Sequence, residues 1–309
     1  MVEPRSSFVD AGHIRLHYLE WDPAQLQHKE GQRSLQENDE IPLVLLHGLG
    51  ATADTWRLVA NSLCHHHLTI AFDLRGHGLS DQPDHGYDLV TMAEDAVQGM
   101  AALGLGKVTL VGHGWGARIA LVLAARHPAL ISHLILVDCP HVEPRHWPGM
   151  TRERFIRQVA PKEIYASRAS FLAAMQREMK AFWSADVESI VLTYVRELAD
   201  GSIEEHLRPE NQRRIREALW DDRALSYYSK VHCPVLLVPA ASKPQFGKAL
   251  PERMEQAAEF AIAKGYMVSQ VERTIRRCSV LWMPETGHDI QLQRPDVLAI
   301  AIEEFVKVV

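Results

Sequence analysis

The sequence predicts an α/β fold in which a mostly parallel sheet is covered by helices on both faces. Short apolar runs alternate with helical patterns over residues 41–138, one run passes through a glycine-rich turn straight into a helix, and a helical stretch interrupts the pattern near residue 140. Alternating strands and helices imply right-handed crossovers, which make neighbouring strands parallel. With 309 residues and 47% hydrophobic content, the chain can bury one large core plus an insertion.

The individual elements follow from periodicity and from helix and turn signals. Residues 8–21 alternate polar and apolar side chains around Gly12, which is typical of a β-hairpin, and the polar residues 22–40 predict an exposed, mobile loop. Asp54 is placed to cap the first core helix. The further strands are expected at 41–46, 68–73, 108–111, 131–138, 233–238 and 279–283, and the core helices at 55–63, 91–103, 115–126, 251–278 and 295–308.

The stretch from residue 139 to about 231 carries no strand signals. Helical patterns lie at 168–183, 186–198 and 211–228, and aromatic side chains are frequent, namely Trp147, Phe182, Trp183, Trp220, Tyr227 and Tyr228. We therefore divide the chain into a core of residues 1–139 and 232–309 and a helical cap of residues 140–231 that covers the site. Most of these aromatic side chains are expected to pack the cap onto the core, and Trp147 and Trp183 are candidate substrate contacts.

The charge and the polarity of the chain limit its partners. A formal net charge of −6 argues against nucleic acid or an anionic membrane as a partner. No apolar run approaches the roughly 20 residues of a membrane span, and the N-terminal residues do not form a signal peptide, so we expect a cytoplasmic protein. The expected partner is a small-molecule substrate, and the sequence leaves the oligomeric state open.

The cysteines indicate neither a disulfide framework nor a metal centre. Cys64, Cys139, Cys233 and Cys278 are scattered without a C-x-x-C pair, which favours buried free thiols. Three histidines follow Cys64, but three adjacent side chains cannot all face one ion. We therefore expect no metal and no cofactor.

The glycine-rich turn Gly112-His113-Gly114-Trp115-Gly116 has two possible chemical uses. A Gly-x-Ser-x-Gly elbow raises a nucleophile above the sheet, and Gly114 stands at that apex. A dinucleotide turn, Gly-x-Gly-x-x-Gly/Ala, is matched by Gly112, Gly114 and Ala117, with Asp138 closing the next strand. A dinucleotide fold carries this turn on its first strand, however, whereas here a hairpin and two further strands precede it.

Three further motifs favour the first use. They are His47-Gly48-Leu49-Gly50, the run Asp73-Leu-Arg-Gly76-His77-Gly78-Leu-Ser80-Asp81, and Gly287-His288. With these motifs the chain resembles the α/β-hydrolase superfamily over essentially its whole length, in a capped, serine-esterase-like or epoxide-hydrolase-like branch. The resemblance implies an eight-stranded, mostly parallel sheet with helices on both faces and a helical cap.

The resemblance also implies roles for particular residues. The N–H groups of Leu49 and Trp115 would form an oxyanion hole, and His288 would be the general base. Residues around the two turns, His47, Gly48 and His113, are then expected to contact substrate. Asp73 and His77 are expected to brace loops.

The chain departs from the family pattern at two positions. Gly114 stands where the family has Ser, or Asp in its epoxide-hydrolase and dehalogenase branches, so covalent catalysis lacks its nucleophile. Residues 239–244, where the family usually has the catalytic acid, contain no carboxylate. We therefore take Asp138 as the acid that orients His288, with Glu285 and Asp289 as local alternatives.

The sequence thus leads to one main functional hypothesis. It is a cofactor-free hydrolase of a small, mostly apolar ester or lactone, with its nucleophile replaced by Gly114 in an inactive or trapped variant. Three alternatives stay open: an epoxide hydrolase or haloalkane dehalogenase that lacks its Asp, a natural ligand-binding pseudohydrolase, and slow hydrolysis by a water that His288 activates.

Overall fold

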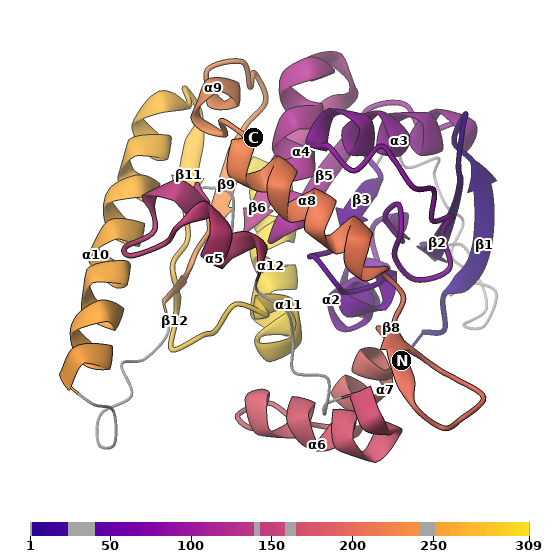
Figure 1. Cartoon of the computed structure of the whole chain (residues 1–309). Helices are drawn as coiled ribbons and strands as arrows, with labels where there is room; N and C mark the ends of the chain where they lie inside the picture. The colour runs from indigo at the N-terminus through magenta and orange to yellow at the C-terminus, as the bar shows by residue number, and fades with distance from the viewer. Residues whose placement is uncertain (1, 24–40, 139–142, 158–164, 242–250, 309) are drawn as a thin grey trace.

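The computed structural model describes residues 2–23, 41–138, 143–157, 165–241 and 251–308 (Figure 1). Its centre is an eight-stranded sheet in the order β1-β2-β4-β3-β5-β6-β9-β11. The strands are β1 (Arg5–Asp10), β2 (Arg15–Trp21), β3 (Leu43–Leu46), β4 (Thr69–Phe72), β5 (Val108–His113), β6 (Ile131–Val137), β9 (Val235–Val238) and β11 (Cys278–Val280). The first hairpin and the β2–β4 pair are antiparallel, and β4, β3, β5, β6, β9 and β11 run parallel. The predicted fold class is confirmed.

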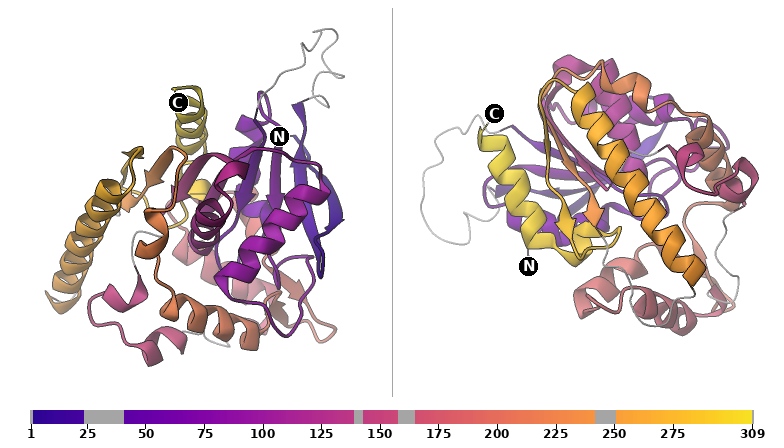
Figure 2. Two further views of the ribbon diagram at one scale, coloured as in Figure 1. Left: turned by 90° about the horizontal axis from the view of Figure 1, so that it is seen from above. Right: turned by 90° about the vertical axis from the view of Figure 1, so that its left-hand side faces the viewer.

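Helices cover both faces of the sheet because alternate residues of each buried strand point to opposite faces. On β3, Val44 and Leu46 pack with α3 (Leu89–Ala102), α4 (Trp115–Arg126) and α10 (Pro251–Thr274). Leu43 and Leu45 instead pack with α2 (Arg57–Leu63) and α12 (Pro295–Val308). Figure 2 shows α10 and α12 on opposite sides of the sheet.

The segment between β6 and β9 is mainly helical, and it also contains a small hairpin. Its helices are α5 (Arg152–Ile156), α6 (Arg168–Glu178), α7 (Ala185–Leu192), α8 (Pro209–Asp221) and α9 (Leu225–Tyr228). The expectation of no strands here is wrong, because β7 (Val195–Glu197) pairs with β8 (Ile203–Glu205). The predicted helix 186–198 therefore ends at Leu192, and the predicted helix 211–228 is broken at Asp222, whose backbone is extended. Figure 1 shows α6 and α7 beyond one end of the sheet.

The start of the first core helix corrects another expectation. The helix begins as a 3₁₀ turn, η1 (Ala53–Trp56), and its N-cap is Thr52 rather than Asp54. Asp54 lies inside the first turn and binds the Arg57 guanidinium instead. A side-chain cap does occur at α3, where Asp88 accepts a hydrogen bond of 2.9 Å from the Thr91 N–H.

The C-terminal part matches the predicted order of elements with small shifts. The predicted strand 279–283 is split into β11 and β12 (Met283–Pro284), and β12 pairs with β10 (Ala240–Ala241) beside the main sheet. A short helix, α11 (Ile290–Gln293), separates the last strand from α12. Cys64 and Cys233 are buried free thiols, Cys278 is half-buried and free, and Cys139 lies outside the described residues, as does most of the 22–40 loop.

Within the described residues, no helix combines the length and the apolar character needed to cross a membrane. In the same ranges, no group of His, Cys, Asp and Glu side chains has an arrangement that could hold a metal ion.

Candidate active site

The turn between β5 and α4 has a backbone that demands glycine at three positions. Gly114 adopts φ +53° and ψ −117°, a conformation that side chains disfavour, and its N–H donates to the Val137 carbonyl at 3.0 Å. A Cβ at Gly112 would lie 2.6 Å from the backbone of Ala117, and one at Gly116 would lie 2.4 Å from the His47 carbonyl. The strand and the helix therefore pack against each other directly, with Gly114 raised at the apex.

The imidazole of His288 faces this apex from the loop after β12. A Cβ built on Gly114 would lie 3.1 Å from the Nε2 atom of His288. On the other side of the ring, Nδ1 donates to Oδ2 of Asp138 at 2.8 Å. The ring thus has one nitrogen directed at the bare apex and the other held by a carboxylate, and its side chain is 57% exposed.

Asp138 follows β6 directly and is the carboxylate bound to His288. Its Oδ1 atom accepts hydrogen bonds from the Ala240 N–H at 2.8 Å and from Nζ of Lys264 at 2.5 Å. Burial would raise the pKa of Asp138, but the hydrogen bond from His288 and the positive charge of Lys264 outweigh it and hold the pKa at about 2. Asp138 is therefore ionised at neutral pH. The acid predicted from the sequence, Asp138, thus lies against the His288 ring.

The surroundings of the two adjacent histidines shift their pKa values in opposite directions. Burial would lower the pKa of His288, but the hydrogen bond and the charge of Asp138 prevail and raise it above the usual histidine value. Its neighbour His113, with ring centres 4.5 Å apart, has its pKa lowered to about 4 by burial and then by the charge of His288. Neutral His113 donates from Nε2 to the His288 carbonyl at 3.0 Å.

The turn at residues 47–50 provides the other side of the candidate site. The N–H groups of Leu49 and Trp115 meet no hydrogen-bond acceptor among the described residues. His47 shapes the turn: its Nδ1 donates to the Gly48 carbonyl at 2.7 Å, and its Nε2 accepts the Leu74 N–H at 3.0 Å. The oxyanion hole expected from these two N–H groups stays a prediction.

Two of the residues expected to contact substrate have buried side chains. His47 is fully buried and His113 is 2% exposed, and both use their ring nitrogens on neighbouring protein groups. Gly48 packs on His113, because a Cβ at Gly48 would lie 2.9 Å from the His113 Nδ1 atom. These residues therefore support the two turns, and their contact with substrate stays a prediction.

The loop of residues 73–81 is braced as expected. Buried Asp73 accepts hydrogen bonds from His17 Nδ1 at 2.7 Å, from the Ala53 N–H at 2.7 Å and from the Leu79 N–H at 2.9 Å. His77 accepts the Gly50 N–H at Nε2, and burial together with the charge of His47 lowers the pKa of His77 to about 3. Neutral His77 therefore fixes the turn that carries the Leu49 amide.

Trp147 and Trp183 lie in two separate apolar clusters. Trp147 packs edge-on against Phe155 and against Phe260 of α10, with ring centres 5.9 and 6.0 Å apart. Trp183 packs in the cluster formed by α6, α7 and neighbouring loops. Their contact with substrate stays a prediction.

Sequence reasoning missed several polar residues close to the site. Neither Lys264 nor Thr55 belongs to a recognisable sequence motif. The Thr55 hydroxyl receives hydrogen bonds from the Tyr194 hydroxyl at 3.0 Å and from Gln291 Nε2 at 3.1 Å. Gln291 also lies 3.4 Å from His113 Nδ1, so this network joins α11 and the segment between β6 and β9 to the elbow.

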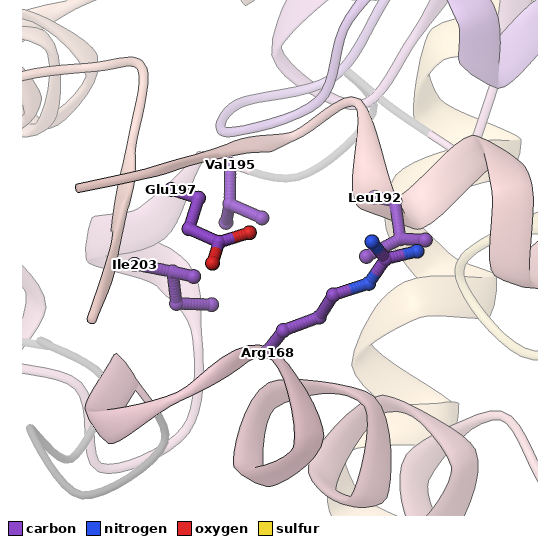
Figure 3. A pocket seen from close by; sticks show the side chains of 5 residues that line it. All are labelled: Arg168, Leu192, Val195, Glu197 and Ile203. Atoms are coloured by element: carbon purple, nitrogen blue, oxygen red, sulfur yellow. The ribbon is translucent and has the colours of Figure 1, made fainter. Parts of the chain in front are cut away.

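A pocket of about 210 Å³ lies within the segment between β6 and β9 (Figure 3). It is lined by Arg168, Leu192, Val195, Glu197 and Ile203. Figure 3 shows Arg168 extending from α6 towards Leu192, with Glu197 on β7. None of the sequence-predicted site residues lines it, so this pocket is separate from the elbow.

Comparison with solved structures identifies the fold. The structure of E-2-(acetamidomethylene)succinate hydrolase superimposes with a TM-score of 0.77 at 20% identity, covering 99% of this chain and 100% of that one. A family profile described as alpha/beta hydrolase fold matches residues 41–160. The chain has the α/β-hydrolase fold. Gly114 follows β5, Asp138 follows β6 and His288 lies in the loop after β12. All three lie at the C-terminal ends of strands, where open α/β sheets bind ligands.

Curated relatives share the α/β-hydrolase elements at higher identity over shorter stretches. Epoxide hydrolase 2 of Caenorhabditis elegans is 33% identical over 136 residues, which are 43% of this chain and 34% of that protein. 2-(Acetamidomethylene)succinate hydrolase of Mesorhizobium japonicum is 35% identical over 112 residues, 36% of this chain and 40% of that protein. The matched part of the chain thus spans about a third of the length of these relatives.

Proposed function

We propose that this chain is an acyl hydrolase for a small, mostly apolar ester or lactone, with its nucleophile position left bare by Gly114. One observation carries the proposal: the His288 Nε2 atom lies 3.1 Å from the place of a Cβ on Gly114, with Asp138 bound to the opposite ring nitrogen. This is the order of groups that activates a nucleophile by a general base. The free amides of Leu49 and Trp115 lie beside the same apex.

With Gly114 the covalent route is closed, and a water molecule would have to take its place. His288 Nε2 would accept a proton from water as the water oxygen bonds to the substrate carbonyl carbon. The oxyanion that forms would accept hydrogen bonds from the N–H groups of Leu49 and Trp115. Collapse of the tetrahedral intermediate would break the bond between its carbon and the alkoxide oxygen. The departing alkoxide would then take the proton from His288. Because a water molecule is less well positioned than a side chain, this reaction is slow.

The test restores the hydroxyl at the apex. Gly114→Ser is expected to hydrolyse p-nitrophenyl esters, assayed over several chain lengths, far faster than the parent protein. Gly114→Ala is the matched control, since it adds the same Cβ and the same backbone strain without a hydroxyl. Adding His288→Ala to Gly114→Ser should lower the rate by about 10²–10⁴-fold. Equal rates for Gly114→Ser and Gly114→Ala would contradict the proposal.

A second candidate is an epoxide hydrolase that lacks its aspartate. The identity to epoxide hydrolase 2 over 136 residues favours it, because the match covers about two fifths of the chain. In that case the new carboxylate of Gly114→Asp should attack an epoxide carbon and form an alkyl ester with the enzyme. The carbon–oxygen bond of the ring breaks, and the epoxide oxygen takes up a proton from water. Intact-protein mass spectrometry after incubation with styrene oxide would show the adduct. If the mass of Gly114→Asp is unchanged and Gly114→Ser hydrolyses esters, the epoxide-hydrolase candidate is excluded and the ester hydrolase remains.

The bare apex itself favours a third candidate, a binding protein without turnover. The parent protein distinguishes this candidate from slow hydrolysis. Turnover that disappears in His288→Ala supports the water reaction, whereas saturable binding of an ester without any turnover supports a binding role. Calorimetry and a coupled hydrolysis assay on the same sample would measure both.

A further inference from the structure

Lys264 brings a buried cation to the carboxylate that holds His288. It lies within α10, which contacts β11 and lies beside it in Figure 1. The Lys264 side chain is 13% exposed and the Asp138 side chain 9%. Its Nζ atom donates to Oδ1 of Asp138 at 2.5 Å and to the Ala240 carbonyl at 2.7 Å. The lysine therefore reaches the acid from the side opposite to the histidine.

The two oxygens of Asp138 have separate partners. Oδ1 accepts the Ala240 N–H and the Lys264 ammonium group, and Oδ2 accepts His288 Nδ1. The backbone of Asp138 is also fixed, since its N–H donates to the Val238 carbonyl at 2.9 Å and its φ is +44°. A buried carboxylate with donors on both oxygens has little freedom to rotate.

We propose that Lys264 is a positioning residue of the candidate active site, which fixes Asp138 so that Oδ2 stays directed at His288. Of the partners that Oδ1 has among the described residues, loss of the ammonium group would leave the Ala240 N–H, and the carboxylate could rotate or draw water into its place. The lysine also offsets the cost of burying the Asp138 charge. The inference rests on the proposed function only where it concerns catalysis; the geometry of the His288–Asp138 pair can be measured without it.

Lys264 has a second effect on the charge of His288. The charged or titratable groups that act on the His288 ring are Asp138, Asp289, His113 and Lys264. The carboxylates favour the imidazolium, and the Lys264 ammonium group opposes it. The lysine thus allows an ionised carboxylate to touch His288 while reducing the tendency of the ring to stay protonated, which a general base requires.

The first test measures the His288–Asp138 hydrogen bond by proton NMR of the full chain. The Nδ1 proton of His288 is expected as a far-downfield signal, assigned by its loss in His288→Gln. Lys264→Met, which keeps the length of the side chain without its charge, should broaden this signal or shift it upfield. Lys264→Arg should retain it, and Lys107→Met, which removes an exposed lysine at the start of β5, should leave it unchanged. If Lys264→Met does not fold, Lys264→Gln replaces it. An unchanged signal in the folded variant would overturn the inference.

The second test uses catalysis in the Gly114→Ser background. Adding Lys264→Met should lower kcat by about 10–100-fold with little change in KM, and adding Lys264→Arg should restore most of the loss. A change confined to the melting temperature, with kcat and the NMR signal intact, would show a purely structural role and contradict the inference. If Gly114→Ser has no activity, the proposed function fails while the NMR test still decides the role of Lys264.

Discussion

At the scale of single residues, Gly114 combines an unusual backbone with an unfilled position. Its φ of +53° and ψ of −117° fall where residues other than glycine pay roughly 1–3 kcal/mol. A Cβ there would also press on His288 Nε2 at 3.1 Å, so the ring must move by a few tenths of an ångström to admit a side chain. The half-exposed ring has room to do so. The glycine therefore stabilises the elbow, and under the proposed function it leaves the apex without a nucleophile.

Gly114→Ala should lower the free energy of unfolding by about 1–3 kcal/mol, measured by urea denaturation. Gly104→Ala is the matched control, because Gly104 also has a positive φ, +70°, but a Cβ there would meet nothing within 4 Å. The control should cost less than Gly114→Ala. Combining Gly114→Ala with His288→Ala should recover the part of the loss that comes from the ring. A loss in Gly114→Ala no larger than in the control would show that contact with His288 is negligible.

The His288–Asp138 pair also predicts a pH dependence for the Gly114→Ser variant. Since Asp138 raises the pKa of His288 above the usual value of about 6.5, the ring is protonated and cannot act as a base at lower pH. The rate, as kcat/KM, should rise with pH through an apparent pKa above 6.5. Asp138→Asn removes the negative charge that raises the pKa of His288. The rise of kcat/KM with pH should therefore move to lower pH in this variant, while its maximal rate falls. A rise that stays in place in Asp138→Asn would mean that another group controls it.

At the scale of elements, the loop between β4 and α3 is held by polar side chains with little exposure. Arg75 donates from Nε and Nη2 to the two oxygens of Asp95 at 2.7 Å each, with 5% and 10% of the side chains exposed. Asp73 holds the start of the loop, and a Cβ at Gly78 would lie 2.0 Å from the Asp73 Oδ2 atom. The loop therefore carries His77 to the turn at Gly50 as a fixed unit.

Arg75→Met should destabilise the fold by about 3–5 kcal/mol, because it leaves the Asp95 carboxylate buried without its partner. Replacing both residues, as Arg75→Met with Asp95→Leu, should recover much of that loss. The control is Arg126→Met on α4, whose ion pair with Glu94 of the same α3 is solvent-exposed and should contribute no more than about 1 kcal/mol. Chemical denaturation of the four proteins measures the differences. Similar losses in the two single variants would contradict the argument.

The elements also show what the sequence could and could not predict. Strands such as β5 and helices such as α4 were predictable because a single period and a glycine turn define their ends. The β7–β8 hairpin was not, because its three-residue strands carry too short a pattern. At the site, Asp138 and His288 follow strands and could be placed, whereas Lys264 lies inside a helix and reaches the acid only through the packing of α10. Contacts of this tertiary kind leave no local signal.

At the scale of the whole molecule, the segment between β6 and β9 is tied to the core on two sides. On one side, the Arg118 guanidinium of α4 binds Asp222 at the end of α8 at 2.7 Å, with 2% and 6% of the side chains exposed. On the other, Thr193 binds Thr52 and Tyr194 binds Thr55, next to the turn at residues 47–50. Because α4 begins at Gly114, the first tie connects α8 to the helix that leaves the elbow. Opening of this segment should therefore depend on the buried ion pair.

Hydrogen exchange can test this dependence for each part of the molecule. Arg118→Met leaves Asp222 buried without its guanidinium, so the amides of α8 (Pro209–Asp221) should exchange faster, by about 10-fold or more. The amides of β5 in the centre of the sheet should remain protected, since local opening does not expose them. Arg208→Met is the control, because Arg208 pairs with Asp84 at an exposed position and its loss should change little. Equal acceleration in α8 and β5 would mean instead that the segment and the sheet unfold as a single cooperative unit, and that the site opens only when the whole fold does.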